Sequence, residues 1–296
     1  MPYASIFGVE HYYEWVCEAG DQPSGKPVMV FLHGWGGSLR YWQSTAQAIA
    51  DEFDCLLYDL RGFGRSRGVV TLPEAVPPYE ESDRYALESY AHDLAGLLDQ
   101  MGLERVYLNA HSTGASIATL FVNRYPERVH RAILTCSGIF EYDERAFKAF
   151  HKFGGYVVKF RPPWLARLPF ANRLFMARFL RRSLPDAISQ AFLEDFIQAD
   201  YDAALNTIYT AVSERAALEM PREFAAITVP TLLVAGEYDI IIPAEMGRQA
   251  AQLSDRVELA VIPETAHFPM LEDPETYLHR VRSFLAAEQP ATSSPS

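Results

Sequence analysis

Residues 106–121, VYLNAHSTGASIATLF, decide how the rest of the chain is interpreted. An apolar run typical of a buried strand ends at Ala110, and a helix rich in small residues is predicted to begin just after Ser112. A serine on so tight a strand-to-helix turn needs small residues two positions to either side, because larger side chains would clash with the backbone and the following helix. Ala110 and Gly114 meet this requirement, so Ser112 is a candidate nucleophile.

Short apolar runs alternate with longer amphipathic stretches along the whole chain, which is typical of a mostly parallel sheet with helices on both faces. The predicted parallel strands are Val28–Leu32, Cys55–Leu60, Val106–Ala110, Ala132–Cys136, Thr231–Ala235 and Val257–Ile262. Before them, Ile6–Cys17 is predicted to form a hairpin of antiparallel edge strands. Helices are predicted over Tyr85–Met101 and Ala115–Arg124.

The alternation is interrupted once, between Gly138 and Val229, where no strand is predicted over roughly 90 residues, too long for a bare loop. We therefore predict a helical lid over residues 139–225, inserted into a core formed by residues 1–138 and 226–287. The last residues, 288–296, are small, polar and proline-containing, and we expect them to be disordered.

The composition is that of a globular protein, with 49% hydrophobic and 22% charged residues. No apolar run reaches the roughly 20 residues that a membrane-spanning helix needs, and the N-terminus lacks the pattern of a secretory signal, so we expect a cytoplasmic location. Three cysteines, an odd count without metal-ligand spacing, are expected to be reduced core residues: Cys17, Cys55 and Cys136. The net charge of -12 disfavours binding to nucleic acid.

A serine hydroxyl becomes a good nucleophile only when a base removes its proton, and a neutral imidazole suits this task near pH 7. His267 lies in the loop PETAHFPMLEDPE, which follows the last predicted strand and can reach over the carboxyl ends of the sheet. His111 adjoins Ser112 but is expected to point to the opposite side of the turn, and His33 belongs to another loop. The histidines interpreted as structural or exposed are His11, His92, His130 and His279.

The imidazole needs a carboxylate that fixes its tautomer and offsets its charge. Asp239, in VAGEYDIIIP, follows the predicted strand Thr231–Ala235, and Glu237 is its local competitor. We favour Asp239, and the resulting order Ser112, Asp239, His267 differs from the orders of the two other common serine-triad architectures.

Attack by serine on a carbonyl creates an oxyanion, which needs preorganised donors. One predicted donor is the backbone N–H of Thr113, at the start of a helix whose dipole also favours negative charge. The other is predicted to be the N–H of Trp35, in the loop HGWGGS, where Gly34 allows a close approach to the site.

Four segments together resemble the α/β-hydrolase superfamily, and within it the lidded group of esterases, ring-cleavage-product hydrolases and cofactor-free haloperoxidase-like enzymes. They are LHGWGG, YDLRGFGRS, AHSTG followed by PERVHRAIL, and PTLLVAGEYDIIIP with ETAHFPMLEDPE. The resemblance implies an α/β fold with a mostly parallel eight-stranded sheet, helices on both faces and an inserted helical lid. It also implies that Asp59 and residues 61–66 form a structural turn rather than part of the triad.

The expected activity is hydrolysis of a carboxylic ester or related acyl compound through an acyl-enzyme, without metal or cofactor. One alternative keeps the triad but cleaves a carbon–carbon bond or makes peracids, as haloperoxidase-like relatives do. A second alternative is a non-catalytic ligand receptor on the same fold. The substrate is expected to be a small, apolar acyl compound.

The predicted lid has an unusual charge pattern, because residues 145–182 hold ten basic residues and no acidic one. Aromatic residues lie between them, several at helical spacing, as in an element that rests on a lipid surface. One hypothesis is that the lid contacts an anionic membrane or admits a bulky apolar or anionic acyl substrate. The other is that the aromatic residues face the core and pocket, while the basic residues are solvated or pair with the acidic body.

Overall fold

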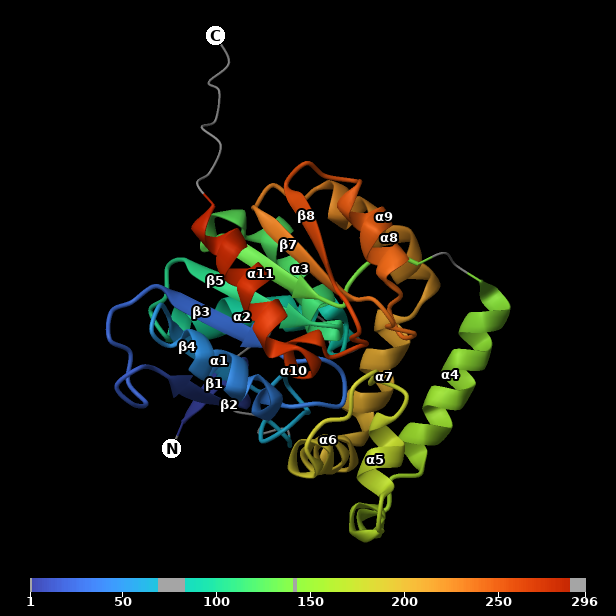
Figure 1. Ribbon diagram of the computed structural model, residues 1–296. Helices are drawn as coiled ribbons and strands as arrows, with labels where there is room; N and C mark the ends of the chain where they lie inside the picture. Colours follow the sequence, from blue (N-terminus) through green and yellow to red (C-terminus); the bar gives the residue numbers. More distant parts are fainter. Residues whose placement is uncertain (1, 69–82, 141–142, 288–296) are drawn as a thin grey trace.

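One sheet of eight strands lies at the centre of the molecule, in the order β1-β2-β4-β3-β5-β6-β7-β8 (Figure 1). The computed structural model describes residues 2–68, 83–140 and 143–287, without the side chains of residues 146, 147, 149, 150 and 153. The strands are β1 (Tyr3–Ile6), β2 (Val9–Val16), β3 (Val28–Leu32), β4 (Asp54–Tyr58), β5 (Val106–His111), β6 (Val129–Thr135), β7 (Thr231–Gly236) and β8 (Val257–Ile262). Strands β3 to β8 run parallel, and β1 and β2 extend the β4 edge in antiparallel pairing.

The side chains of the central strands are buried on both faces of the sheet. In β3, Val30 and Leu32 belong to one hydrophobic cluster, and Met29 and Phe31 belong to a second. Because successive side chains of a strand point to opposite faces, each face needs its own cover of helices. Helices α2 (Leu87–Gln100), α3 (Thr113–Arg124) and α8 (Glu214–Ala225) contribute to the first cluster. Helices α1 (Gln43–Ile49) and α11 (Pro274–Ala286) contribute to the second.

The helices connect the parallel strands. They are α1 (Gln43–Ile49), α2 (Leu87–Gln100), α3 (Thr113–Arg124), α4 (Glu144–Lys159), α5 (Ala171–Met176), α6 (Asp186–Gln198), α7 (Tyr201–Ala211), α8 (Glu214–Ala225), α9 (Ala244–Ala251), α10 (Pro269–Glu272) and α11 (Pro274–Ala286). Three short 3-10 helices are η1 (Leu39–Trp42), η3 (Pro126–Arg128) and η4 (Pro163–Arg167). In the described part of the chain, no helix is both long and apolar enough to cross a membrane.

The predicted strand positions are confirmed to within a few residues. Among the parallel strands, the largest differences are that β4 ends at Tyr58, before the predicted end at Leu60, and that β6 begins at Val129 rather than Ala132. The edge hairpin begins earlier than predicted, since its first strand, β1, overlaps the predicted range only at Ile6. After Asp59 the backbone leaves the sheet, because the N–H of Leu60 donates to the His33 side chain instead of to a neighbouring strand. The three cysteines are free and buried, as the sequence indicated.

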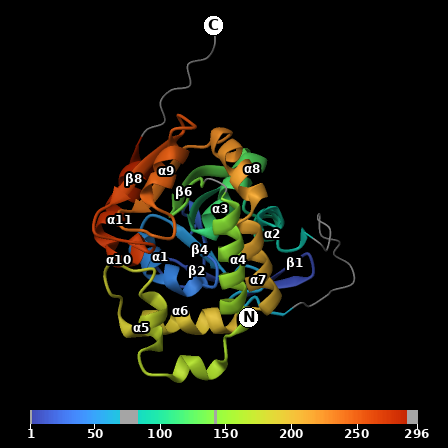
Figure 2. The ribbon, with the colours of Figure 1, turned by 90° about the vertical axis from the view of Figure 1, so that its right-hand side faces the viewer.

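The described residues between β6 and β7 form helices α4 to α8 and η4, without a strand (Figure 2). In this helical insertion α4 packs against α7, and α5 packs against α6. The last helix of the insertion, α8, contacts α3 and α9 of the core. The boundaries at residues 139 and 225 stay a prediction, and the predicted disordered tail at 288–296 lies outside the described residues.

The turn after β4 packs the core against the helical insertion. Asp59 accepts hydrogen bonds from the backbone N–H groups of Leu39 and Arg65, at 2.7 Å each. Gly62, with φ +83°, approaches α7 so closely that an added Cβ would lie 2.2 Å from the Cβ of Ala203. The segment is a structural turn, as the resemblance implied.

We expect Gly62→Ala to lower the free energy of unfolding by about 3 kcal/mol. The new methyl group would clash with Ala203 of α7, and a positive φ is unfavourable for alanine. Gly102→Ala is the matched control, since Gly102 has φ +66° and nothing lies within 4 Å of its added Cβ. The control should cost only about 1 kcal/mol. Urea unfolding measures both, and equal losses would contradict the close contact between the turn and α7.

Candidate active site

Ser112 occupies a strained turn between β5 and α3. Its backbone has φ 54° and ψ -120°, a conformation that non-glycine residues rarely adopt and that is typical of a nucleophile elbow. Gly114 allows this turn, because a Cβ at this position would lie 2.5 Å from the backbone oxygen of His33. The requirement for a small residue after the serine therefore arises from the close approach of α3 to β3.

The structure brings the three predicted triad residues together at the carboxyl edge of the sheet. The Ser112 Oγ lies 3.2 Å from His267 Nε2, and His267 Nδ1 lies 2.7 Å from Asp239 Oδ2. A carboxylate only accepts, so His267 donates through Nδ1–H and Nε2 is left to accept the serine proton. His267 and Asp239 are each 4% exposed, and Ser112 is half-buried.

Asp239 is held in place by the loop that carries it. Its Oδ1 accepts hydrogen bonds from the backbone N–H groups of Ile241 and Ile242, at 2.8 and 3.1 Å, which leaves Oδ2 for the imidazole. The competitor Glu237 is exposed, and its carboxylate accepts from the N–H of Glu264 instead. Of the two acids, the structure therefore places Asp239 at His267.

A second carboxylate, which the sequence analysis missed, organises the loop around His267. Glu272 is buried, and its Oε1 accepts from the backbone N–H groups of Ala266 and Phe268, at 2.9 and 3.3 Å. Its Oε2 accepts from the N–H groups of Arg181 and Arg182 in the helical insertion, at 2.7 and 2.8 Å. The sequence feature that could have indicated this role is the position of Glu272 in LEDPE, five residues after the candidate base His267.

The two predicted oxyanion donors face the same site. The N–H groups of Trp35 and Thr113 have no acceptor among the described residues, and both residues line the pocket that contains Ser112. The Trp35 indole donates to the backbone oxygen of Ala204 in α7 at 2.7 Å, which holds this loop against the insertion. By contrast, the N–H of Gly34 already donates to the hydroxyl of Tyr41.

Tyr41 and His111 link the loop after β3 to the loop of the candidate base. His111 Nε2 lies 2.7 Å from the backbone oxygen of His267, so Nε2 carries the proton. Burial lowers the pKa of His111 well below its ordinary value, and the neutral ring can accept through Nδ1 from the Tyr41 hydroxyl, 3.0 Å away. Gly34, Tyr41, His111 and His267 thus form one chain of hydrogen bonds behind Ser112.

His33 holds the end of β3. Its Nδ1–H donates to the backbone oxygen of Gly34 at 2.8 Å, and its Nε2 accepts from the N–H of Leu60 at 2.9 Å. The side chain is fully buried, and burial lowers the pKa of His33 to about 4. It is a structural group, since both ring nitrogens are used by the backbone.

Ser112 opens into a cavity of about 160 Å³ whose walls are mainly apolar. The insertion supplies much of the wall through aromatic and aliphatic side chains, and the core supplies the polar end. The insertion residues are Phe175, Met176, Phe179, Phe192, Phe196, Ile208, Ala211 and Val212. Several predicted lid aromatics therefore face the pocket, although Phe147, Phe150 and Phe153 lie outside the described side chains.

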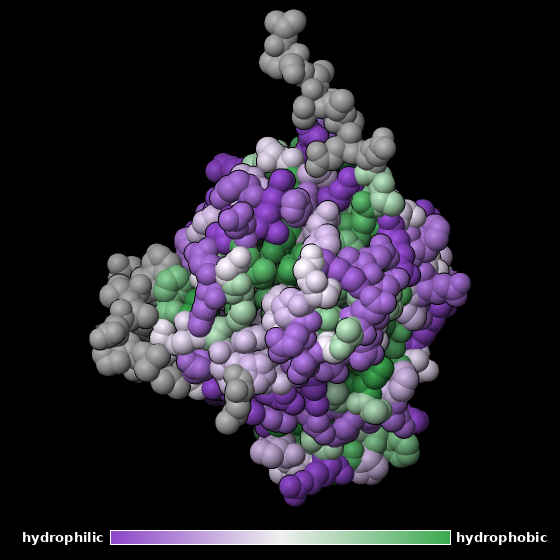
Figure 3. All heavy atoms as spheres, turned by 90° about the vertical axis from the view of Figure 1, so that its left-hand side faces the viewer, coloured by the Kyte–Doolittle hydropathy of each residue, from purple (hydrophilic) through white to green (hydrophobic). Residues whose placement is uncertain are grey.

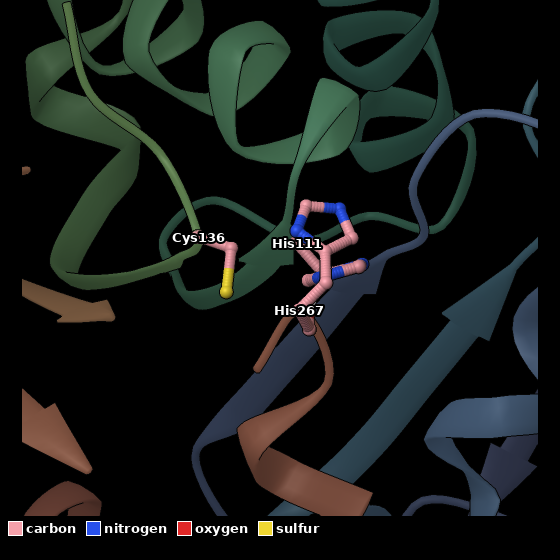
Figure 4. A group of neighbouring side chains, drawn as sticks. All are labelled: His111, Cys136 and His267. Carbon is pink, nitrogen blue, oxygen red and sulfur yellow. Dashed lines mark hydrogen bonds between the residues drawn. The ribbon is translucent and has the colours of Figure 1, made fainter. Parts of the chain in front are cut away.

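Three buried side chains beside the serine contain potential metal-ligand atoms (Figure 4). The ligand atoms of His111, Cys136 and His267 lie within 4.8 Å of one another. Both nitrogens of each imidazole already have hydrogen-bond partners, and burial raises the pKa of the Cys136 thiol well above its ordinary value. Because metal ligation needs a thiolate and free ring nitrogens, we assign no metal centre to this group.

We expect Tyr41→Phe to lower the free energy of unfolding by about 1 to 3 kcal/mol, because it leaves the buried Gly34 N–H and His111 Nδ1 without their partner. Tyr107→Phe is the control, since Tyr107 is half-buried and its hydroxyl has no hydrogen bond to the described residues. Its effect should stay within about 0.5 kcal/mol. Chemical unfolding compares the two, and a similar small loss in both would contradict the role of the Tyr41 hydroxyl.

The lowered pKa of His33 predicts a loss of stability in acid. In the unfolded chain His33 has the ordinary histidine pKa of ~6.5, whereas in the folded state its pKa is about 4. Between these pH values the unfolded state therefore binds a proton that the folded state does not bind. The contribution is complete above about pH 6.5 and is lost toward pH 4, by on the order of 3 kcal/mol. Glutamine does not titrate, so in His33→Gln the unfolding free energy should drop between pH 6.5 and pH 4 by about 3 kcal/mol less than in wild type. Urea unfolding at the two pH values measures this difference. An equal drop in both proteins would contradict the role of His33.

Comparisons with known proteins identify the family of this chain. Residues 27–274 match the model of the alpha/beta hydrolase fold family. RutD of Pseudomonas savastanoi pv. phaseolicola, named as a candidate carbamate hydrolase, is 25% identical over 288 residues, which cover 90% of this chain and 96% of that protein.

Two solved structures show the same fold. A thermophilic esterase from Thermogutta terrifontis has 23% identity and a TM-score of 0.72, with 96% of this chain and 98% of that chain covered. An enol-lactonase from Burkholderia xenovorans has 20% identity and a TM-score of 0.72, with 97% and 100% covered. Since the family model spans most of the sequence, the chain belongs to the alpha/beta hydrolase fold family.

Proposed function

We propose that this protein is a serine hydrolase that cleaves a carboxylic ester or related acyl compound through an acyl-enzyme. The observation that carries the proposal is the continuous hydrogen-bonded path from Ser112 Oγ to His267, at 3.2 Å, and from His267 to Asp239, at 2.7 Å, at the wall of an apolar cavity. This is the arrangement that nucleophilic acyl transfer requires.

In the proposed first step, Ser112 Oγ attacks the substrate carbonyl while His267 Nε2 accepts the hydroxyl proton. Asp239 holds the Nδ1–H and offsets the charge of the imidazolium that forms. His267 then donates its proton to the leaving group, and the acyl group stays on Ser112. In the second step His267 takes a proton from water as the water oxygen attacks the acyl carbon. The bond from this carbon to Ser112 Oγ then breaks, His267 returns its proton to Oγ, and the acid is released.

The tetrahedral intermediates carry a negative oxygen, for which the N–H groups of Trp35 and Thr113 are the proposed donors. Thr113 is the first residue of α3, so its N–H has no acceptor within the helix and the helix dipole adds a favourable field. Trp35 is positioned from a different loop, through the hydrogen bond of its indole to α7. Two donors from independent segments can converge on one oxygen.

The cavity favours an apolar acyl group. Rings of Phe175, Phe179 and Phe192 line it, and Ser137 adds a buried hydroxyl that has no hydrogen-bond partner among the described residues. A mostly apolar substrate with one polar atom within reach of Ser137 fits this lining. Carbamates and lactones, which appear in the names of two similar proteins, present the same kind of carbonyl and belong in the substrate panel.

We expect Ser112→Ala to lower kcat/KM for a chromogenic ester by about 1,000-fold or more, because no other hydroxyl receives the help of His267. Ser283→Ala, on the exposed side of α11, is the matched control and should keep wild-type activity. Initial rates of chromophore release at one pH give kcat/KM for both variants. The same assay is repeated with a carbamate that releases the same chromophore.

Labelling with a fluorophosphonate separates the alternatives. Wild type should be labelled and Ser112→Ala should not. A folded wild type that neither turns over an acyl substrate nor reacts with the probe would refute the hydrolase and favour a ligand receptor. Labelling combined with cleavage of a vinylogous diketone, but of no ester or carbamate, would instead favour carbon–carbon bond hydrolysis.

A further inference from the structure

Exposed apolar side chains gather on one short part of the helical insertion. Among the described residues, six of the twelve exposed large hydrophobic side chains lie between residues 156 and 174. They are Tyr156, Phe160, Trp164, Leu168, Phe170 and Leu174, and we call this segment the apolar tip. Leu174 is 80% exposed, and Phe160 and Phe170 are each 69% exposed. Exposed apolar side chains concentrated on one segment are typical of an interaction site.

The apolar tip includes the end of α4, the helix η4 and the start of α5. These elements form the lowest part of the molecule in both ribbon views, below α6 (Figures 1 and 2). By contrast, hydrophilic residues cover most of the face drawn in Figure 3, and hydrophobic residues form smaller groups between them. The tip therefore projects from the body, where a flat partner can reach it.

Basic residues flank the tip in the sequence and lie within it. Residues 145–182 hold ten of the 26 basic residues and none of the 38 acidic residues of the chain. Some of them pair with acids outside this range; these pairs are Lys148 with Glu144, Arg173 with Asp186, Arg181 with Glu264 and Arg182 with Asp273. Among the exposed cations, Lys152, Lys159, Arg167 and Arg178 have no ion pair with any described residue.

We propose that the apolar tip docks on an anionic lipid membrane. Aromatic and leucine side chains enter the interface, and these four cations contact the lipid phosphates, as in helices that lie on membranes. Charge complementarity selects this partner. All 38 acidic residues lie outside 145–182, so in a protein of net charge -12 this segment is one whose own charge favours contact with an anionic surface.

A second copy of the chain is a less suitable occupant of the tip. Two tips placed face to face would bring their unpaired cations together, and like charges oppose such an approach. A symmetric contact through this segment would need acidic residues opposite the cations, and the segment contains none. The same argument does not apply to a lipid surface, which supplies the opposite charge.

The position of the tip connects docking to the cavity. In α5, Phe175 and Met176 line the cavity, while the preceding Leu174 faces solvent on the outer side. One short helix therefore contacts both the cavity and the proposed membrane. If the proposed hydrolysis holds, an apolar acyl substrate can pass from the bilayer to Ser112 along α5. Docking itself does not depend on catalysis.

Cosedimentation with vesicles tests the proposal. Wild type should pellet with vesicles of phosphatidylcholine and phosphatidylglycerol at low salt, and should pellet much less with phosphatidylcholine alone or at high salt. Phe160→Ser/Leu174→Ser and Lys159→Glu/Arg167→Glu should each reduce the pelleted fraction several-fold. The control Leu218→Ser/Arg256→Glu, which changes the same residue types at exposed positions in α8 and just before β8, outside the tip, should pellet like wild type.

All variants are to be checked for an unchanged unfolding midpoint and for wild-type hydrolysis of a water-soluble ester, so that loss of binding is separated from loss of folding or catalysis. Wild type that stays in the supernatant with anionic vesicles at low salt would overturn the proposal. So would pelleting that the tip variants leave unchanged. A dimer in solution that the tip variants dissociate, without vesicle binding, would assign the tip to a second copy instead.

Discussion

The strained backbone at Ser112 is the constraint on which the site depends. A positive φ at a residue with a side chain is unfavourable, and the surrounding structure must compensate for it. Here the compensation comes from the close approach of α3 to β3, which only a glycine at position 114 allows. The strain directs the serine hydroxyl away from the sheet, toward the imidazole of His267, and leaves the first N–H of α3 without an acceptor in the helix.

Three sets of hydrogen bonds then fix the loops around that serine. Glu272 ties the loop of His267 to the insertion, the Trp35 indole ties the loop after β3 to α7, and the chain through Tyr41 and His111 joins the two loops behind the elbow. None of these groups reacts in the proposed mechanism. Their role is to hold the reacting atoms within hydrogen-bond distance, which is where much of the catalytic advantage of a preorganised site arises.

The helical insertion has two apolar sides with different roles. Its inner side supplies much of the cavity wall, and Phe175 and Phe179 face the pocket as one of the two interpretations of the lid aromatics expected. Phe192 and Phe196 of α6 line the same cavity. Its outer side keeps another set of aromatic and leucine residues in solvent, among cations that lack partners. Burial in the core therefore explains only part of the sequence pattern, and the remainder motivates the membrane proposal.

By itself the sequence determined the order of strands and helices, the elbow at Ser112 and the identity of the triad candidates, because these depend on local patterns: apolar runs, small residues at fixed offsets and the chain order of three polar groups. Only the tertiary structure decided that Asp239 rather than Glu237 meets the imidazole, that Glu272 and Tyr41 support the site, and which aromatic residues face the cavity. Those outcomes depend on contacts between residues far apart in the chain, which no local pattern encodes.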